Sequence, residues 1–152
     1  MFYITEKKYF SPKAINIYKK ISPILNKKNN NIKVLIVRLG YKIDKHFLKK
    51  FKNLKFIISN TTGLDHIDRN YCQNKNIKVL SLNNVRSKIK NIYSTADLTI
   101  GLLISLVRKI NLSNRYVVKN KKFERYKFIS NDLSNLTVGI LGYGRLGKRI
   151  GK

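Results

Sequence analysis

Short runs of apolar residues alternate with helical patterns through the first ninety positions of the chain. The continuous apolar run Val34–Val37 is typical of a strand buried on both faces of a parallel sheet, and the largely apolar segments Leu54–Ile58 and Val79–Leu80 predict further strands. A shorter run, Phe2–Ile4, predicts a further strand before them. The polar run Asn26–Asn31 predicts a loop, because it offers no apolar face.

Helix start signals lie between these runs. Ser11 followed by Pro12 indicates an N-cap with proline at the first helical position, and apolar residues then recur at helical spacing. Asp44 can cap a second helix, and 68–75 has the pattern of a short third one. Strands that alternate with helices in this way predict an α/β fold with a parallel sheet.

A longer helix is expected from Ser94. Ser94 and Asp97 have the spacing of a capping box, and the residues up to Val107 are apolar almost all round. Such a helix is expected to be buried between layers or domains, with its exposed half beginning at Arg108. This chain by itself is expected to leave Leu102 and Leu106 exposed, because the full domain would cover them. A polar, basic connector (119–135) follows, and then Thr137–Leu141 has the pattern of a strand.

This last strand leads directly into a glycine-rich motif, Gly142-Tyr143-Gly144-Arg145-Leu146-Gly147. A G-x-G-x-x-G string between a strand and a helix predicts dinucleotide binding. Gly142 would make the tight turn, Gly144 would let the backbone approach the pyrophosphate, and Gly147 would allow close packing. Amides near Arg145 and Leu146 would then face the phosphates at the helix start. The alternative is a glycine-rich loop without a ligand.

A second candidate site is the segment 60–68, which follows the predicted strand Leu54–Ile58 at its carboxyl end. Open α/β sheets bind ligands at this end of their strands. Free amides around Thr62 and Gly63 could hold a carboxylate. From the residues alone, a plain strand-to-helix turn capped by Asp65 is the simpler interpretation.

The charge of the chain is extreme, with 33 Lys and Arg residues against 7 Asp and Glu and a net charge of +26. Such a balance suggests a polyanionic partner. The basic residues are nevertheless spread from Lys7 to Lys152 among many Asn and Ile residues, which favours compositional drift over a selected patch. The densest lysine runs lack the interleaved aromatic residues of a single-strand binding platform. We therefore expect no specific nucleic-acid partner.

The remaining composition points to the cytoplasm. The single Cys72 excludes an internal disulfide, and no base lies near it in the sequence to make it a nucleophile. The first residues do not have the pattern of a signal peptide, and the longest apolar stretch, Leu98–Val107, is too short for a membrane span of roughly 20 residues. We expect no metal site and no membrane partner.

Four ordered motifs together resemble the D-isomer-specific 2-hydroxyacid dehydrogenase family, of the phosphoglycerate dehydrogenase and glyoxylate/hydroxypyruvate reductase type. They are 34–38, 62–68, 94–108 and 137–147, and the resemblance extends over nearly the whole chain. The resemblance implies a flavodoxin-like, parallel-sheet substrate domain at 1–91. It also implies that 92–152 forms the interdomain helix and the truncated start of a Rossmann NAD-binding domain.

The resemblance also implies a function, namely NAD-dependent hydride transfer between nicotinamide and a 2-hydroxy or 2-oxo acid, with NADP left open as the cofactor. Arg38, Thr62 and Gly63 would bind the substrate, and the full-length protein would be a homodimer. The cofactor would contact Thr62, Thr95, Gly142, Tyr143, Gly144, Arg145, Leu146 and Gly147.

The catalytic Arg, Glu and His of the family lie downstream of the glycine-rich loop, and this sequence ends five residues after Gly147. The acidic residue that binds the ribose, expected about 20 residues past the motif, is also absent. A surface or helix-cap role is expected for His46 and His66. The resemblance therefore implies a fragment without catalytic residues that is inactive alone. The alternatives are a non-catalytic NAD-sensing module of the same fold and a basic nucleic-acid-binding protein.

Overall fold

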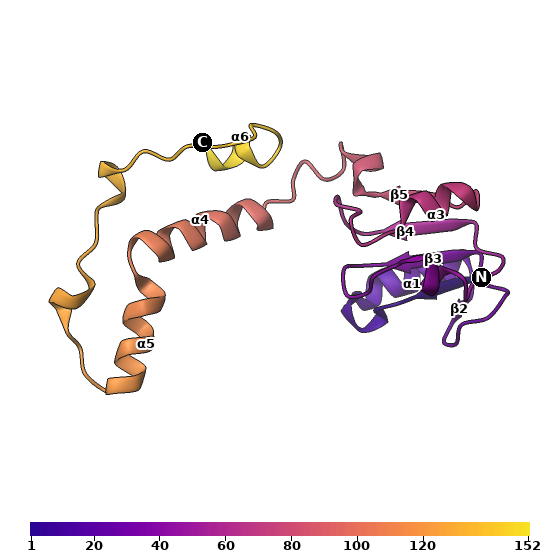
Figure 1. The fold of residues 1–152 in the computed structure, drawn as a ribbon, viewed down its shortest axis with the longest axis horizontal. Helices are drawn as coiled ribbons and strands as arrows, with labels where there is room; N and C mark the ends of the chain where they lie inside the picture. Colours follow the sequence, from indigo (N-terminus) through magenta and orange to yellow (C-terminus); the bar gives the residue numbers. More distant parts are fainter. The chain divides into compact units, whose positions relative to one another are not determined.

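The computed structural model describes residues 1–152, which divide into two compact units, Met1–Ile89 and Lys90–Lys152. The first unit contains one sheet of five strands in the order β2-β1-β3-β4-β5, and every pairing is parallel (Figure 1). The strands are β1 (Phe2–Ile4), β2 (Ile24–Leu25), β3 (Val34–Val37), β4 (Phe56–Ser59) and β5 (Lys78–Ser81). This order is that of flavodoxin-like folds, so the predicted fold is confirmed. The two-residue strand β2 was not predicted.

Three helices of the first unit begin at side-chain caps, of which Ser11 and Asp44 are predicted by the sequence. They are α1 (Pro12–Ile21), α2 (Lys45–Leu48) and α3 (Arg69–Asn74). The side chains of Ser11, Asp44 and Asp68 each accept a hydrogen bond from a backbone amide of the first turn, at 3.2, 2.8 and 2.9 Å. Asp68 caps α3, so the alternative of Asp65 as the cap is wrong.

The core of the first unit lies on both faces of the sheet. Leu35 and Val37 of the middle strand β3 pack on one face with Leu48 of α2 and Cys72 of α3. The intervening residue of that strand lies on the other face, in a cluster made of Ile4, Ile15 and Ile36. Because side chains alternate along a strand, β3 supports helices on both sides, as its continuous apolar run predicts.

The second unit consists of helices. These are α4 (Ser94–Val107), α5 (Ile110–Asn120), two 3-10 turns (Arg125–Phe128 and Leu133–Asn135) and α6 (Gly147–Ile150). Two details differ from expectation. Ser94 lies inside α4 and Tyr93 occupies the cap position without a side-chain bond, so the predicted capping box does not form. Lys109 has a φ of 51°, which ends α4 and separates it from α5.

One further expectation for this unit is wrong, and the exposure of Leu102 and Leu106 is the one expected for this chain by itself. Ala96 is the only buried residue of α4, whereas Leu98, Leu102 and Leu106 are exposed by 63%, 57% and 78%. The predicted strand 137–141 does not form, and Leu141 is fully exposed. The exposed helix and the missing strand have one physical cause. A strand requires a neighbouring strand, and an apolar helix requires a layer that covers it, and this unit contains neither a second strand nor such a layer. No helix is both long and apolar enough to cross a membrane.

We expect Cys72 to be unreactive while the first unit is folded. Burial, with a smaller contribution from Asp68, raises the pKa of this thiol to about 11. At pH 8 its thiolate fraction is then on the order of one in a thousand. Iodoacetamide labelling followed by mass spectrometry should give negligible modification in buffer and full modification in denaturant. Rapid labelling of the native chain would contradict the buried position of Cys72.

Candidate functional site

The loops that follow β1, β3, β4 and β5 meet at the carboxyl edge of the parallel sheet. Strands β4 and β5 are in register from Phe56 opposite Lys78 to Ser59 opposite Ser81. The loop after β4 therefore starts beside the 3-10 helix Leu82–Val85 (η2) that follows β5. This is the edge at which open α/β sheets bind ligands.

The loop after β4 has three consecutive carbonyl oxygens that are all hydrogen-bonded within the first unit. The amide of Leu82 donates to the oxygen of Thr61 at 3.1 Å, and the side-chain amide of Asn83 donates to that of Thr62 at 2.7 Å. The hydroxyl of Thr61 donates to the oxygen of Gly63, also at 2.7 Å. Each of the three peptide planes is thus fixed at its carbonyl end.

Fixing the carbonyls determines where the amides point. All peptide bonds are trans, so the N–H of each following residue points away from the anchored oxygen. These are the amides of Thr62, Gly63 and Leu64, and none of them donates to another group of the protein. Three consecutive free amides form a concave donor surface of the kind that binds anions. The structure therefore places free amides at the predicted residues Thr62 and Gly63, and it adds Leu64.

Beneath this loop lies a small polar network. The hydroxyl of Ser59, only 1% exposed, lies 2.7 Å from the hydroxyl of Thr61 and 3.4 Å from Nε2 of His66. Burial lowers the pKa of His66, although the nearby carboxylates of Asp65 and Glu6 act to raise it. His66 is half-buried and bonded to this network, so the expected surface or cap role is wrong for it. His46 is exposed on α2, as expected.

Arg38, at the start of the loop after β3, reaches the same edge of the sheet. Its backbone amide and that of Gly40 donate to the carboxylate oxygens of Glu6, at 3.1 and 3.0 Å. Its guanidinium donates to the carbonyl oxygen of Tyr9 at 2.8 Å and lies 5.7 Å from the ring centre of Phe10. The guanidinium is thus held by the segment that follows β1. Sequence reasoning missed Glu6, which determines the conformation of this loop.

An open depression of about 450 Å³ lies beside the free amides. Thr62, Leu64 and Asn83 line one part of it, and Arg69 and Asn70 of α3 line another. Its volume lies within the range of small-molecule binding pockets.

The glycine-rich loop belongs to the second unit and has the backbone geometry that its motif predicts. Gly142 has a φ of +95°, a region that other residues rarely adopt. A Cβ added to Gly147 would overlap the carbonyl oxygen of Gly142 and lie 3.3 Å from the side chain of Ile140, whereas one on Gly144 would meet nothing within 4 Å. Gly144 is therefore open to an approaching group and Gly147 is required for packing.

The amides of this loop are available for a phosphate. The first hydrogen bond of the terminal helix runs from the amide of Lys148 to the oxygen of Gly144 at 3.0 Å, so the amides of Arg145, Leu146 and Gly147 have no helical acceptor. The guanidinium of Arg145 donates to the oxygen of Ile92 at 3.0 Å, and α6 packs against α4. The residues present therefore fit a pyrophosphate.

Thr95 lies exposed in the first turn of α4, where its carbonyl oxygen accepts a hydrogen bond from the hydroxyl of Thr99 at 2.8 Å. It belongs to the second unit, and Thr62 belongs to the first. The assignment of both threonines to the cofactor stays a prediction.

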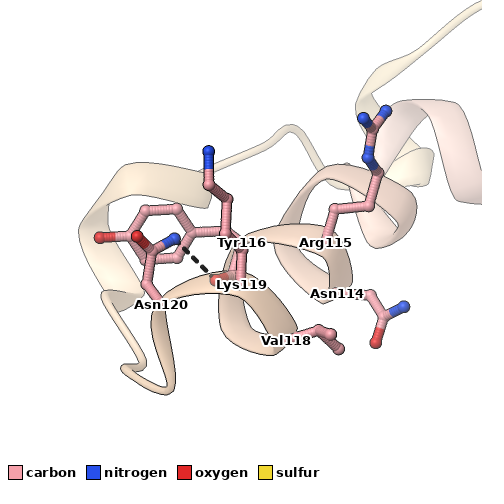
Figure 2. Close-up of a pocket in the computed structure, with 6 residues that line it drawn as sticks. All are labelled: Asn114, Arg115, Tyr116, Val118, Lys119 and Asn120. Atoms are coloured by element: carbon pink, nitrogen blue, oxygen red, sulfur yellow. Dashed lines mark hydrogen bonds between the residues drawn. The ribbon is translucent and has the colours of Figure 1, made fainter.

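Another hollow of the chain does not coincide with either loop. It has a volume of about 540 Å³ and lies along α5, lined by the residues drawn in Figure 2. All of them come from one helix, and the only side-chain hydrogen bond among them, from Asn120 to the carbonyl oxygen of Tyr116, is within that helix. A single helix supplies one wall and no converging polar groups, so this hollow is not a candidate site.

The chain can be compared with known proteins in sequence and in fold. The family model described as "D-isomer specific 2-hydroxyacid dehydrogenase, catalytic domain" matches residues 5–138. The chain belongs to this family. Glyoxylate/hydroxypyruvate reductase A of Arabidopsis thaliana is 31% identical over 132 residues, which are 86% of this chain and 40% of that protein. D-3-phosphoglycerate dehydrogenase of Archaeoglobus fulgidus is 36% identical over 118 residues, 78% of this chain and 21% of that one.

Solved structures agree on the fold. D-lactate dehydrogenase from Aquifex aeolicus, complexed with NAD and lactic acid, matches with a TM-score of 0.73 at 23% identity, over 98% of this chain and 46% of that one. The chain thus spans less than half the length of each of these three relatives.

We expect Gly147→Ala to disrupt the glycine-rich loop, because the added methyl overlaps the Gly142 carbonyl oxygen. The cost should be on the order of 1–3 kcal/mol, as for overpacking elsewhere. Backbone amide resonances of 140–151 should shift throughout. Gly139→Ala is the matched control, since its methyl meets nothing within 4 Å, and only its sequence neighbours should respond. Equal responses to the two substitutions would refute the close approach.

Proposed function

We propose that this chain provides the substrate-binding loop and the pyrophosphate-binding loop of an NAD-dependent D-2-hydroxyacid dehydrogenase. Such an enzyme transfers a hydride between nicotinamide and C2 of a 2-hydroxy or 2-oxo acid. The observation that carries the proposal is the row of free amides at Thr62, Gly63 and Leu64, whose peptide planes are fixed by three carbonyl hydrogen bonds. A preorganised row of donors suits a substrate carboxylate, which all 2-hydroxy acids share.

Each part of the substrate site has a distinct role in this proposal. The amides of Thr62, Gly63 and Leu64 donate to the carboxylate oxygens and so fix the orientation of C2. Arg38 contributes positive charge from the loop after β3, where Glu6 holds its backbone. Asn83 keeps the Gly63 amide directed outward through its bond to the Thr62 oxygen. These groups bind and orient the substrate and transfer no proton.

The cofactor loop has a separate role. Gly142, Gly144 and Gly147 shape a turn that brings backbone close to a pyrophosphate, and the amides of Tyr143, Arg145 and Leu146 are assigned to the same group. NAD, when bound, supplies the nicotinamide that exchanges the hydride. Thr62 and Thr95 are proposed as further cofactor contacts.

Hydride transfer to or from C2 is accompanied by a proton transfer, and the residue that donates or accepts this proton must lie outside the substrate-binding and cofactor-binding residues named above. His46 is exposed on α2, and His66 is bonded to Ser59 below the substrate loop. Neither therefore serves as the acid or base next to C2. We propose that the catalytic Arg, Glu and His belong to a longer polypeptide. That complete protein would be a cytoplasmic homodimer with no specific nucleic-acid partner.

The binding half of the proposal can be tested on residues 1–152 with glyoxylate as the probe. Titration followed by 1H–15N correlation spectra should shift the amides of Thr62, Gly63 and Leu64. Asn83→Ala removes the anchor of the Thr62 oxygen, and we expect about a 5-fold weaker glyoxylate affinity for the loss of one such bond, about 1 kcal/mol.

Asn70→Ala is the matched control, because Asn70 lines the same depression and forms no side-chain hydrogen bond to the loop. It should change the affinity by less than about 2-fold, within the usual range of surface substitutions. Absence of glyoxylate shifts at 62–64 in the wild-type chain would show that the loop is not a carboxylate site.

The catalytic half predicts that residues 1–152 alone reduce no NAD with any 2-hydroxy acid, because the chain contains no residue placed to accept the proton. The measurement is NADH absorbance in the presence of D-lactate, glycolate and D-glycerate. A complete family member serves as the positive control. Turnover by the isolated chain would mean that the catalytic residues are assigned wrongly.

A further inference from the structure

Below the substrate loop, four polar groups form an unbroken chain of hydrogen bonds. The chain runs from His66 through the hydroxyls of Ser59 and Thr61 to the carbonyl oxygen of Gly63, with separations of 3.4, 2.7 and 2.7 Å. We propose that His66 is a positioning residue, which donates its Nε2 hydrogen to Ser59 and thereby directs this chain so that the Leu64 amide faces the substrate carboxylate. The inference rests on the proposed function of the loop.

The direction of the chain follows from counting hydrogens. A carbonyl oxygen can only accept, so the single hydrogen of the Thr61 hydroxyl is committed to Gly63. Thr61 can then only accept from Ser59, which commits the hydrogen of Ser59. The Ser59 oxygen is left as an acceptor, so the 3.4 Å contact requires a hydrogen on Nε2 of His66. The imidazole is therefore in the Nε2–H form.

The direction of these hydrogen bonds is energetically important because Ser59 is buried. Ser59 is 1% exposed, so its oxygen has little access to water as an alternative partner. A buried hydroxyl without its partner costs free energy, and hydrogen bonds in a directed chain strengthen one another. The chain ends on the oxygen of Gly63, and the trans peptide places the Leu64 N–H on the opposite side. His66 thus acts on the substrate loop at a distance of three hydrogen bonds.

Protonation of His66 does not reverse the chain. The charged groups that face the ring are Asp65, next to it in the sequence, and Glu6 from the segment after β1, and burial outweighs both in lowering the His66 pKa. At neutral pH the ring is neutral, and below its pKa it is a cation. Both forms donate from Nε2, and only the Nδ1–H tautomer cannot. We therefore expect the orientation of the loop to persist on acidification.

The tautomer can be measured directly on the unmodified chain. Long-range 1H–15N spectra of residues 1–152 at pH 8 distinguish a protonated from an unprotonated ring nitrogen. The expected result is a protonated Nε2 and a bare Nδ1 for His66, and the exposed His46, whose side chain forms no hydrogen bond, serves as the internal reference. A bare Nε2 on His66 would overturn the proposal without any substitution, and it leaves the carboxylate site itself untouched.

Two substitutions then test the effect on the loop. His66→Gln keeps an N–H donor at a similar distance from the backbone, and His66→Leu removes it. We expect glyoxylate affinity to fall about 3- to 10-fold in His66→Leu and to stay within about 2-fold of wild type in His66→Gln. The Leu64 amide should lose its glyoxylate shift in His66→Leu more completely than the Thr62 amide, which is anchored separately through the Thr61 oxygen.

The outcomes distinguish a failure of the role of His66 from a failure of the carboxylate site itself. Glyoxylate shifts in the wild type with equal affinity in His66→Leu would reject His66 as a positioning residue while the proposed function stands. No glyoxylate shifts in any form would reject the carboxylate site. If His66→Leu does not fold, Ser59→Ala breaks the same chain with a smaller change of volume and should give the same selective loss at Leu64.

Discussion

The conformation of the proposed substrate loop depends on the hydrogen bonds that three of its carbonyl oxygens accept. Thr61, Thr62 and Gly63 each have their oxygen held inside the first unit, by the η2 backbone, by Asn83 and by the Thr61 hydroxyl. This is possible only because β4 and β5 are parallel neighbours with Ser59 opposite Ser81, which brings the two following loops together. A shift of register by one residue would remove Leu82 and Asn83 from reach of the loop.

The two loops proposed to bind anions both expose free backbone amides, and they do so by different physical means. In the first unit, hydrogen bonds to the carbonyls leave the amides free, and ordinary residues occupy the loop. In the second unit, glycine itself is required, since Gly142 has a positive φ and Gly147 has no room for a side chain. The first loop can therefore be altered through residues that never contact a ligand, such as Asn83 and Ser59, whereas the second is altered mainly through its own glycines.

Sequence reasoning succeeded where the physical cause is local. The caps at Ser11 and Asp44 and the buried strands β3 and β4 are predicted from neighbouring residues, and the spacing of the glycine motif predicts its geometry. Sequence reasoning failed where the local conformation depends on a residue that is distant in the sequence. Asn83 bonds to Thr62 across 21 positions and Glu6 to Arg38 across 32, and no local pattern reveals such pairs. The segment 137–141 has a strand-like sequence and yet forms no strand, because pairing requires a neighbour that the sequence pattern cannot supply.

Three of the seven acidic residues of this very basic chain hold turns or helix starts in place. Glu6, Asp44 and Asp68 all accept hydrogen bonds from backbone amides, and so do the neutral side chains of Asn29 and Asn84 at other turns. What these turns require is an oxygen acceptor, which an asparagine provides without any negative charge. A mutational bias toward Lys and Asn codons can thus drive the isoelectric point upward while the turns keep their acceptors, so the fold tolerates a change of charge that would otherwise remove its helix starts.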